Sequence, residues 1–155
     1  MTLRFARGHA SRTEYVVRLR YVRMTIRVFL GLGALLAAIA VALGAFGAHG
    51  LETRVTPDRI DTFNTGVQYQ MYHALALLLV GVLLAMGAPA SMLFWAGISF
   101  LVGILFFSGS LYTLVLTDTP VLGAVAPIGG VSFILGWALV AWTVFTWVPE
   151  SPMSP

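Results

Sequence analysis

Residues 28–48 read VFLGLGALLAAIAVALGAFGA and contain no charged side chain. An α-helix of about 20 apolar residues crosses a hydrocarbon core of about 30 Å. This stretch therefore predicts a first membrane span. A signal peptide cleaved near residues 45–47 is the alternative, but the apolar region of a signal peptide is usually only about 7–15 residues long. The length of the run favours an uncleaved span.

The composition of the whole chain agrees with a membrane protein. Hydrophobic residues make up 59% of the 155 residues and charged residues only 10%, whereas soluble domains carry about 25% charged residues. The length is that of a single domain. The chain has no cysteine, which excludes disulfides, thiolate metal sites and cysteine nucleophiles.

Basic side chains gather before the first span. Residues 1–27 hold seven Arg and one Glu, and the rest of the chain holds two Arg and five acidic residues. Because positive charge accumulates on the cytoplasmic side of membrane proteins, we interpret residues 1–27 as a basic cytoplasmic segment. A mostly disordered tail is favoured over an amphipathic helix lying on anionic headgroups. A transit peptide and an extension upstream of a start at Met24 remain open. The orientation rule explains this charge, so no nucleic-acid partner is expected.

Three further apolar runs predict three further spans. Thr56, Pro57 and Asp58 are typical of a helix start, with Thr56 as the cap and Pro57 at the first helical position. No charge occurs between Asp61 and Asp118, and residues 87–91 contain the one strong helix breaker of that stretch, which divides it into spans at about 66–86 and 92–116. The fourth apolar run, residues 121–148, is too long for an upright crossing at about 1.5 Å per residue. Pro127 therefore kinks or starts the fourth helix.

The predicted fold is all-α, an integral membrane bundle of four transmembrane helices over residues 28–148. Residues 149–155 form a short C-terminal tail. An even number of spans places both termini in the cytoplasm, and we expect a bacterial inner (plasma) membrane location. The small-residue pairs Ser99/Gly103 and Ser132/Gly136 allow close helix approach. Packing within one bundle is favoured over a homo-oligomer interface.

Polar residues at membrane depth are the candidate functional residues, because such groups must face protein or water. Thr62, Gly66, Tyr69 and His73 share one face of the second predicted helix. We predict that His73 lies near the outer membrane boundary, buried against the first or third span. Its expected hydrogen-bond partner is a serine of the third span, a carbonyl near Gly47, or water. The full candidate set is His49, Thr65, Gln68, Tyr69, Gln70, His73, Ser108 and Ser110.

The favoured role for these residues is a structural hydrogen-bond network, with a proton relay or ligand site as the alternative. No metal ligand spacing, nucleophile elbow or phosphate-binding loop is present, so we expect no cofactor, no metal and no enzyme activity. The predicted function is a structural or accessory component of a membrane complex. A small oligomeric channel or carrier, with a path along the His73 face, is the alternative. The expected partners are the lipid bilayer and either other membrane proteins or further copies of the chain.

Four motifs occur in order along the chain: GAFGAHGL (44–51), FNTGVQYQMYHAL (63–75), FSGSLY (107–112), and APIGG (126–130) followed by Gly136-Trp137. This ordered set resembles the family called domain of unknown function 423, which includes the bacterial YgdD and YwdK proteins and is similar to the eukaryotic transmembrane protein 256. The resemblance covers roughly residues 26–148. It implies a small four-span membrane protein and assigns no residue a catalytic role.

Overall fold

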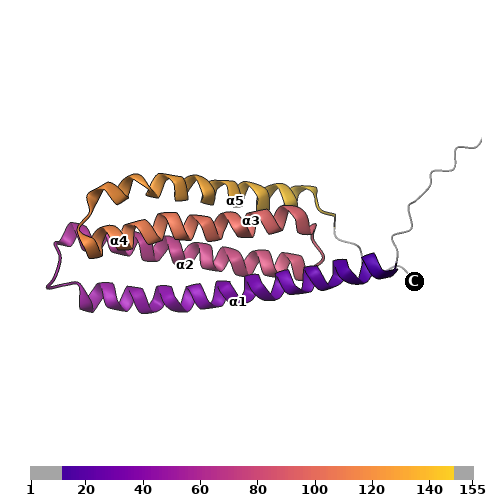
Figure 1. Ribbon diagram of the computed structural model, residues 1–155, viewed down its shortest axis with the longest axis horizontal. Helices are drawn as coiled ribbons and strands as arrows, with labels where there is room; N and C mark the ends of the chain where they lie inside the picture. Colours follow the sequence, from indigo (N-terminus) through magenta and orange to yellow (C-terminus); the bar gives the residue numbers. More distant parts are fainter. Residues whose placement is uncertain (1–11, 149–155) are drawn as a thin grey trace, which may run out of the picture.

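The computed structural model describes residues 12–148, and that part of the chain is helical between short turns (Figure 1). Its elements are α1 (Arg12–Gly50), α2 (Pro57–Ala85), α3 (Ala90–Gly103), the π-helical turn η1 (Ile104–Ser108), α4 (Gly109–Thr117), the 3₁₀ turn η2 (Pro120–Ala124) and α5 (Ala126–Thr146). Because α3, η1 and α4 follow one another without a break, they form a single rod. The described residues thus contain four rods that are long and apolar enough to cross a membrane.

Local sequence explains where most of these rods begin and end. Pro57 occupies the first turn of α2, as predicted, but the Thr56 side chain makes no capping hydrogen bond, so that expectation was wrong. Gly87 closes the α2–α3 turn with φ 89°, a conformation open to glycine at little cost. Pro127 lies in the first turn of α5. It therefore starts the fourth helix rather than kinking it.

The first rod corrects one expectation about the basic segment. Residues 12–27, for which the sequence favoured a disordered tail, continue the first span as one helix of 39 residues. Residues 12–30 contain no Gly or Pro, and Arg is a good helix former, so nothing interrupts the helix. At about 1.5 Å per residue α1 is about 58 Å long, and it extends past the α2–α3 turn (Figure 1). Residues 1–11 and the tail 149–155 lie outside the described residues.

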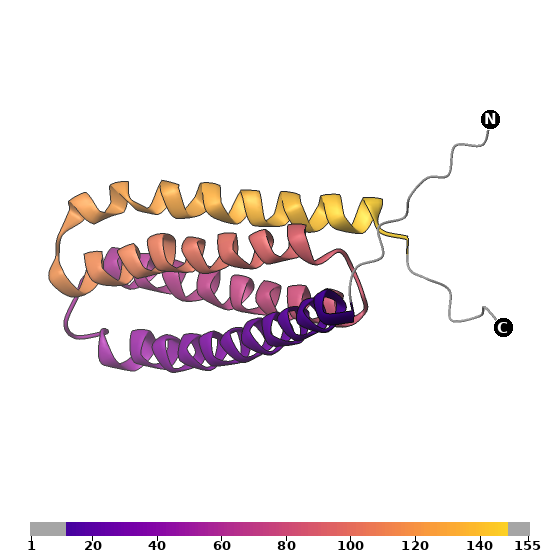
Figure 2. The same ribbon diagram turned by 45° about the vertical axis from the view of Figure 1, so that its right-hand side comes forward.

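The rods pack in a fixed order, with α2 and the α3–η1–α4 rod between α1 and α5. Helix α1 contacts mainly α2, α2 also contacts the α3–η1–α4 rod, and α5 packs on that rod, as both views show (Figures 1 and 2). One core cluster includes Phe29, Leu77, Phe100 and Phe133. A second cluster, around Phe63 and Leu114, lies toward the α1–α2 loop.

Aromatic rings pack directly against glycines of neighbouring helices within this bundle. Phe133 of α5 lies on Gly103 of α3, and in return Phe100 of α3 lies on Gly136 of α5. Phe29 of α1 packs in the same way on Gly97. A Cβ at any of the three glycines would overlap the ring. Gly103 and Gly136 belong to the two small-residue pairs, so the favoured prediction of packing within one bundle is confirmed for them.

Candidate functional site

The bundle interior holds few polar side chains, and most of them are sequence candidates. The buried polar residues are Thr25, Gln70, His73, Ser108, Ser110 and Thr143. Thr25 and Thr143 donate to the backbone carbonyl four residues earlier in their own helices. That leaves Gln70, His73, Ser108 and Ser110, of which Gln70 and His73 each make hydrogen bonds to other helices, in two separate networks.

His73 uses both of its ring nitrogens. Nδ1 lies 2.7 Å from the Tyr69 carbonyl oxygen, and Nε2 lies 3.2 Å from Nε1 of Trp137 on α5. A carbonyl can only accept and an indole N–H can only donate. The pair of contacts therefore requires a neutral imidazole with its proton on Nδ1. The ring also stacks on Phe133, with centroids 3.4 Å apart and planes 7° apart, so α5 fixes its orientation.

This geometry corrects the prediction for the His73 partner. The side chain is buried, at 5% exposure, but its partners are Tyr69 and Trp137 rather than a serine or a carbonyl near Gly47. It packs against Phe133 and Trp137 of α5 and against Phe100 of α3. His73 lies near the middle of α2 (Pro57–Ala85). The sequence did contain a signal, since Trp137 is the one tryptophan far from a helix end.

Gln70 joins three helices in the second network. Its Nε2 donates to the Leu36 carbonyl oxygen of α1 (2.9 Å), and its Oε1 accepts from the Tyr112 hydroxyl of α4 (3.0 Å). Gly66, one turn before Gln70, makes room for Tyr112, because a Cβ there would lie 2.8 Å from the tyrosine ring. Both ends of the amide are satisfied, so Gln70 acts as a clamp between α1, α2 and α4.

The two candidate serines lie in and just after the π-helical turn. In this turn the Gly109 N–H donates to the Ile104 carbonyl five residues back. Ser110 Oγ donates to the Phe107 carbonyl (2.9 Å). Ser108 is fully buried, and within residues 12–148 its Oγ has no well-formed hydrogen bond; the nearby Tyr112 hydroxyl donates to Gln70 instead. Ser108 therefore belongs beside the Gln70 clamp and not beside His73.

The remaining candidates do not join these networks. Thr65 Oγ1 donates to the Asp61 carbonyl of its own helix. Gln68 is exposed on α2, and His49 is exposed in the last turn of α1. The Tyr69 ring stacks on Phe107 with centroids 4.4 Å apart. The backbone carbonyl of Tyr69 accepts the hydrogen bond from His73 Nδ1. The predicted polar set thus does not form one site.

A groove of about 410 Å³ separates α2 from α5 beside His73. It is lined by Tyr69, Tyr72, His73, Phe107, Gly130, Phe133, Ile134 and Trp137. Several of these are exposed, with Trp137 at 42%, so the groove opens on the outer surface of the bundle. The groove is therefore lined mainly by aromatic side chains and lies open to the surroundings of the bundle.

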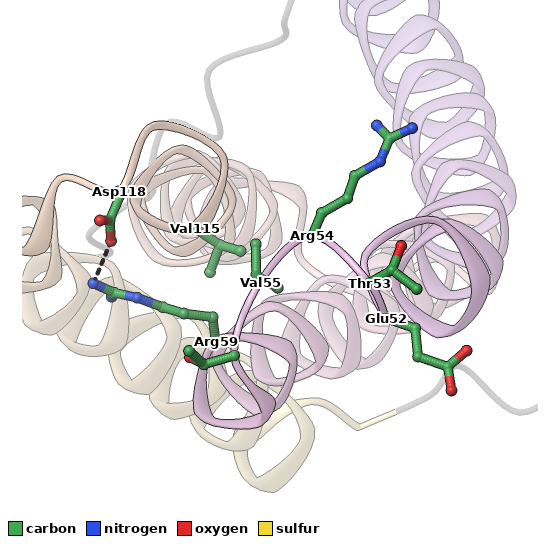
Figure 3. Close-up of a pocket in the computed structure, with 8 residues that line it drawn as sticks. Glu52, Thr53, Arg54, Val55, Arg59, Val115 and Asp118 are labelled. Atoms are coloured by element: carbon green, nitrogen blue, oxygen red, sulfur yellow. Dashed lines mark hydrogen bonds and ion pairs between the residues drawn. The ribbon is translucent and has the colours of Figure 1, made fainter.

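A larger cavity of about 660 Å³ lies at the end of the bundle that holds the α1–α2 loop. Figure 3 shows Arg59 reaching across it to Asp118, with the guanidinium 2.7 Å from the carboxylate, while Arg54 points away. Asp118 ends α4 in the left-handed conformation, φ 48°, which Asp tolerates better than most residues. The ion pair ties the start of α2 to the end of α4, and as an exposed pair it contributes about 0–1 kcal/mol.

No group of three or more His, Asp or Glu side chains within residues 12–148 is placed to hold a metal ion. Between Asp61 and Asp118 the sequence offers no carboxylate at all. The buried polar residues therefore carry only hydroxyl, amide and imidazole groups. Most of these groups already form hydrogen bonds with other side chains or with backbone carbonyls.

Comparison with known proteins places this arrangement in a family. The family model described as protein of unknown function (DUF423) matches residues 43–130. UPF0382 membrane proteins of Staphylococcus aureus strains bovine RF122 / ET3-1 and USA300 are each 48% identical over 120 residues, covering 77% of this chain and 97% of theirs. No solved structure matches. The chain therefore belongs to the family of membrane proteins of unknown function 423.

Proposed function

We propose that this membrane protein is a non-enzymatic structural or accessory component of a membrane complex. The observation that carries the proposal is how the interior polar groups are used. Both ring nitrogens of His73 and both ends of the Gln70 amide are engaged in contacts inside the bundle. With both ring nitrogens engaged inside its own protein, His73 has no nitrogen left to bind a substrate.

A small oligomeric channel or carrier is the competing function. It would need water around His73, because a transported proton or solute must reach the ring. The rings of Phe133, Phe107 and Trp137 surround that position instead. These neighbours favour a dry hydrogen-bonded pair, and so a structural role. An enzyme acting on lipid would need an acid, base or metal beside His73 and Ser108, and the chain offers no carboxylate in its spans up to Asp118.

The bacterial inner (plasma) membrane, with both termini in the cytoplasm, is our proposed location. Support comes from the arginine bias: within the described residues, α1 carries Arg12, Arg18, Arg20, Arg23 and Arg27 at its start. Helix α5 ends at the same end of the bundle at which α1 begins (Figure 1). Positive charge of this kind marks the cytoplasmic side.

Purification in mild detergent, followed by mass spectrometry, tests the accessory role. We expect a reproducible set of membrane proteins to co-purify with the tagged chain. The same set should co-purify with His73→Gln, because glutamine can still accept from Trp137. The proposal fails if no protein co-purifies while reconstituted liposomes show proton or solute flux that His73→Leu abolishes.

A further inference from the structure

A second groove lies at the opposite end of the bundle from the α1–α2 loop, between the extended start of α1 and the start of α3. Its volume is about 370 Å³. Residues of two distant segments line it: Arg18, Tyr21 and Val22 from α1, and Ala90, Ser91, Phe94 and Trp95 from α3. The groove exists because α1 continues past the α2–α3 turn, so that its first turns overhang the start of α3.

Aromatic rings form the floor of this groove. The Tyr21 and Phe94 ring centroids are 6.2 Å apart, and Phe94 meets Trp95 edge to face at 5.5 Å. Trp95 is 60% exposed. Tryptophan and tyrosine are enriched at the level of lipid headgroups, where one end of the side chain is apolar and the other is wet. The floor therefore has the chemistry of the membrane interface, where an acyl chain meets its headgroup.

Arg18 supplies the charge at this groove. It lines the cavity and is exposed, and within residues 12–148 it makes no ion pair or hydrogen bond. Arg20 lies about 200° around the helix axis from Arg18, because successive residues are about 100° apart on an α-helix. It does not line the groove. One arginine thus lines the groove, and its neighbour two residues on does not.

We propose that this groove binds an anionic phospholipid, with the phosphate on Arg18 and an acyl chain along Phe94 and Trp95. A guanidinium binds a phosphate through two parallel hydrogen bonds, and an aromatic floor gives the chain apolar contact. The charge of the segment fits this ligand, because residues 12–27 contain five Arg and one Glu. The inference needs only the membrane location, and it holds whether or not the accessory role is correct.

Native mass spectrometry of the full chain tests the proposal, using protein released from nanodiscs of equal parts phosphatidylglycerol and phosphatidylcholine. The parent should retain phosphatidylglycerol in preference to phosphatidylcholine. Arg18→Gln should lower the retained phosphatidylglycerol about tenfold, the loss expected when hydrogen bonds to a charged phosphate are removed. Arg20→Gln is the matched control and should change it by less than about twofold, because Arg20 does not line the groove. Soluble glycerol 3-phosphate should not compete, because it lacks the acyl chain.

A second pair of variants tests the aromatic floor. Trp95→Ala should also lower phosphatidylglycerol retention, whereas Trp142→Ala, a comparably exposed tryptophan of α5 outside the groove, should not. Unchanged helicity by circular dichroism would show that each variant is folded. Equal losses for Arg18→Gln and Arg20→Gln would overturn the proposal, because they would indicate diffuse attraction to the surface. Equal retention of the two lipids by the parent would also overturn it.

Discussion

Gln70 and His73 lie one turn apart on α2 yet join different neighbours. Gln70 reaches α1 and α4, and His73 reaches α5. Hydrogen bonds between helices in a membrane are worth about 0.6 kcal/mol on average, and at most about 1.7. Their energetic contribution is therefore modest, but they fix which faces of the helices meet, which apolar contacts alone specify less strictly. This gives Gln70 and His73 a structural reason to lie in the interior.

The Tyr112 hydroxyl provides a test of the Gln70 clamp. Tyr112→Phe removes the donor to Gln70 Oε1 and leaves that oxygen unpaired, so we expect a loss of about 0.5–1.5 kcal/mol in unfolding free energy. Tyr72→Phe is the control, because Tyr72 is exposed on the same bundle and its hydroxyl makes no hydrogen bond within residues 12–148. Unfolding in mixed micelles with increasing SDS measures both. Equal midpoints for Tyr112→Phe and the parent would contradict the clamp.

The α3–η1–α4 rod and α5 approach each other closely at one glycine. A Cβ on Gly129 would overlap the backbone of Phe107, lying 2.8 Å from its Cα and closer still to its N. Phe107 belongs to the π-helical turn η1, where one extra residue widens the helix. The π-helical turn and Gly129 thus meet backbone to backbone. A Cβ on Gly130, the next residue, would have no neighbouring atom within 4 Å.

These adjacent glycines make a matched pair of variants. Gly129→Ala forces α5 away from the π-helical turn, and overpacking of this kind costs about 1–3 kcal/mol. Gly130→Ala meets open space, so it should be neutral or stabilise the helix by up to about 1 kcal/mol. Thermal unfolding in detergent compares the two. If Gly129→Ala is as stable as Gly130→Ala, the close approach is not a feature of the folded protein.

Residues 12–148 form a bundle with an even number of rods that are long and apolar enough to cross a membrane, and the start of α1 and the end of α5 lie at the same end of it (Figure 1). A fusion of alkaline phosphatase at Pro149 should be inactive, because that enzyme requires the oxidising compartment outside the cytoplasm for its disulfides. A fusion in the α1–α2 loop, after Thr53, should be active. Activity at Pro149 would rule out an even number of spans with the start of the chain in the cytoplasm.

The sequence predicted the elements of this molecule better than their contacts. Apolar length, Pro57, Pro127 and the breaker at 87–91 located the four spans, because these signals are local. The π-helical turn has no such local signal, and its close contact is with Gly129 of another helix. The partners of His73 were missed for the same reason, because pairing depends on which helices are neighbours and how each is rotated. The one hint in the sequence was that Trp137, unlike the other tryptophans, lies far from the end of its predicted helix.

The hydrogen bond between His73 and Trp137 is the contact on which the structural role of the interior depends. A double-mutant cycle of His73→Leu and Trp137→Phe, measured by unfolding in mixed micelles, isolates it. We expect His73→Leu to cost about 1–3 kcal/mol and the coupling between the two sites to be about 0.6–1.7 kcal/mol. His73→Gln should retain most of the stability. A coupling of zero, with His73→Leu as stable as the parent but altered in proton or solute flux, would contradict the structural role and favour a transport path.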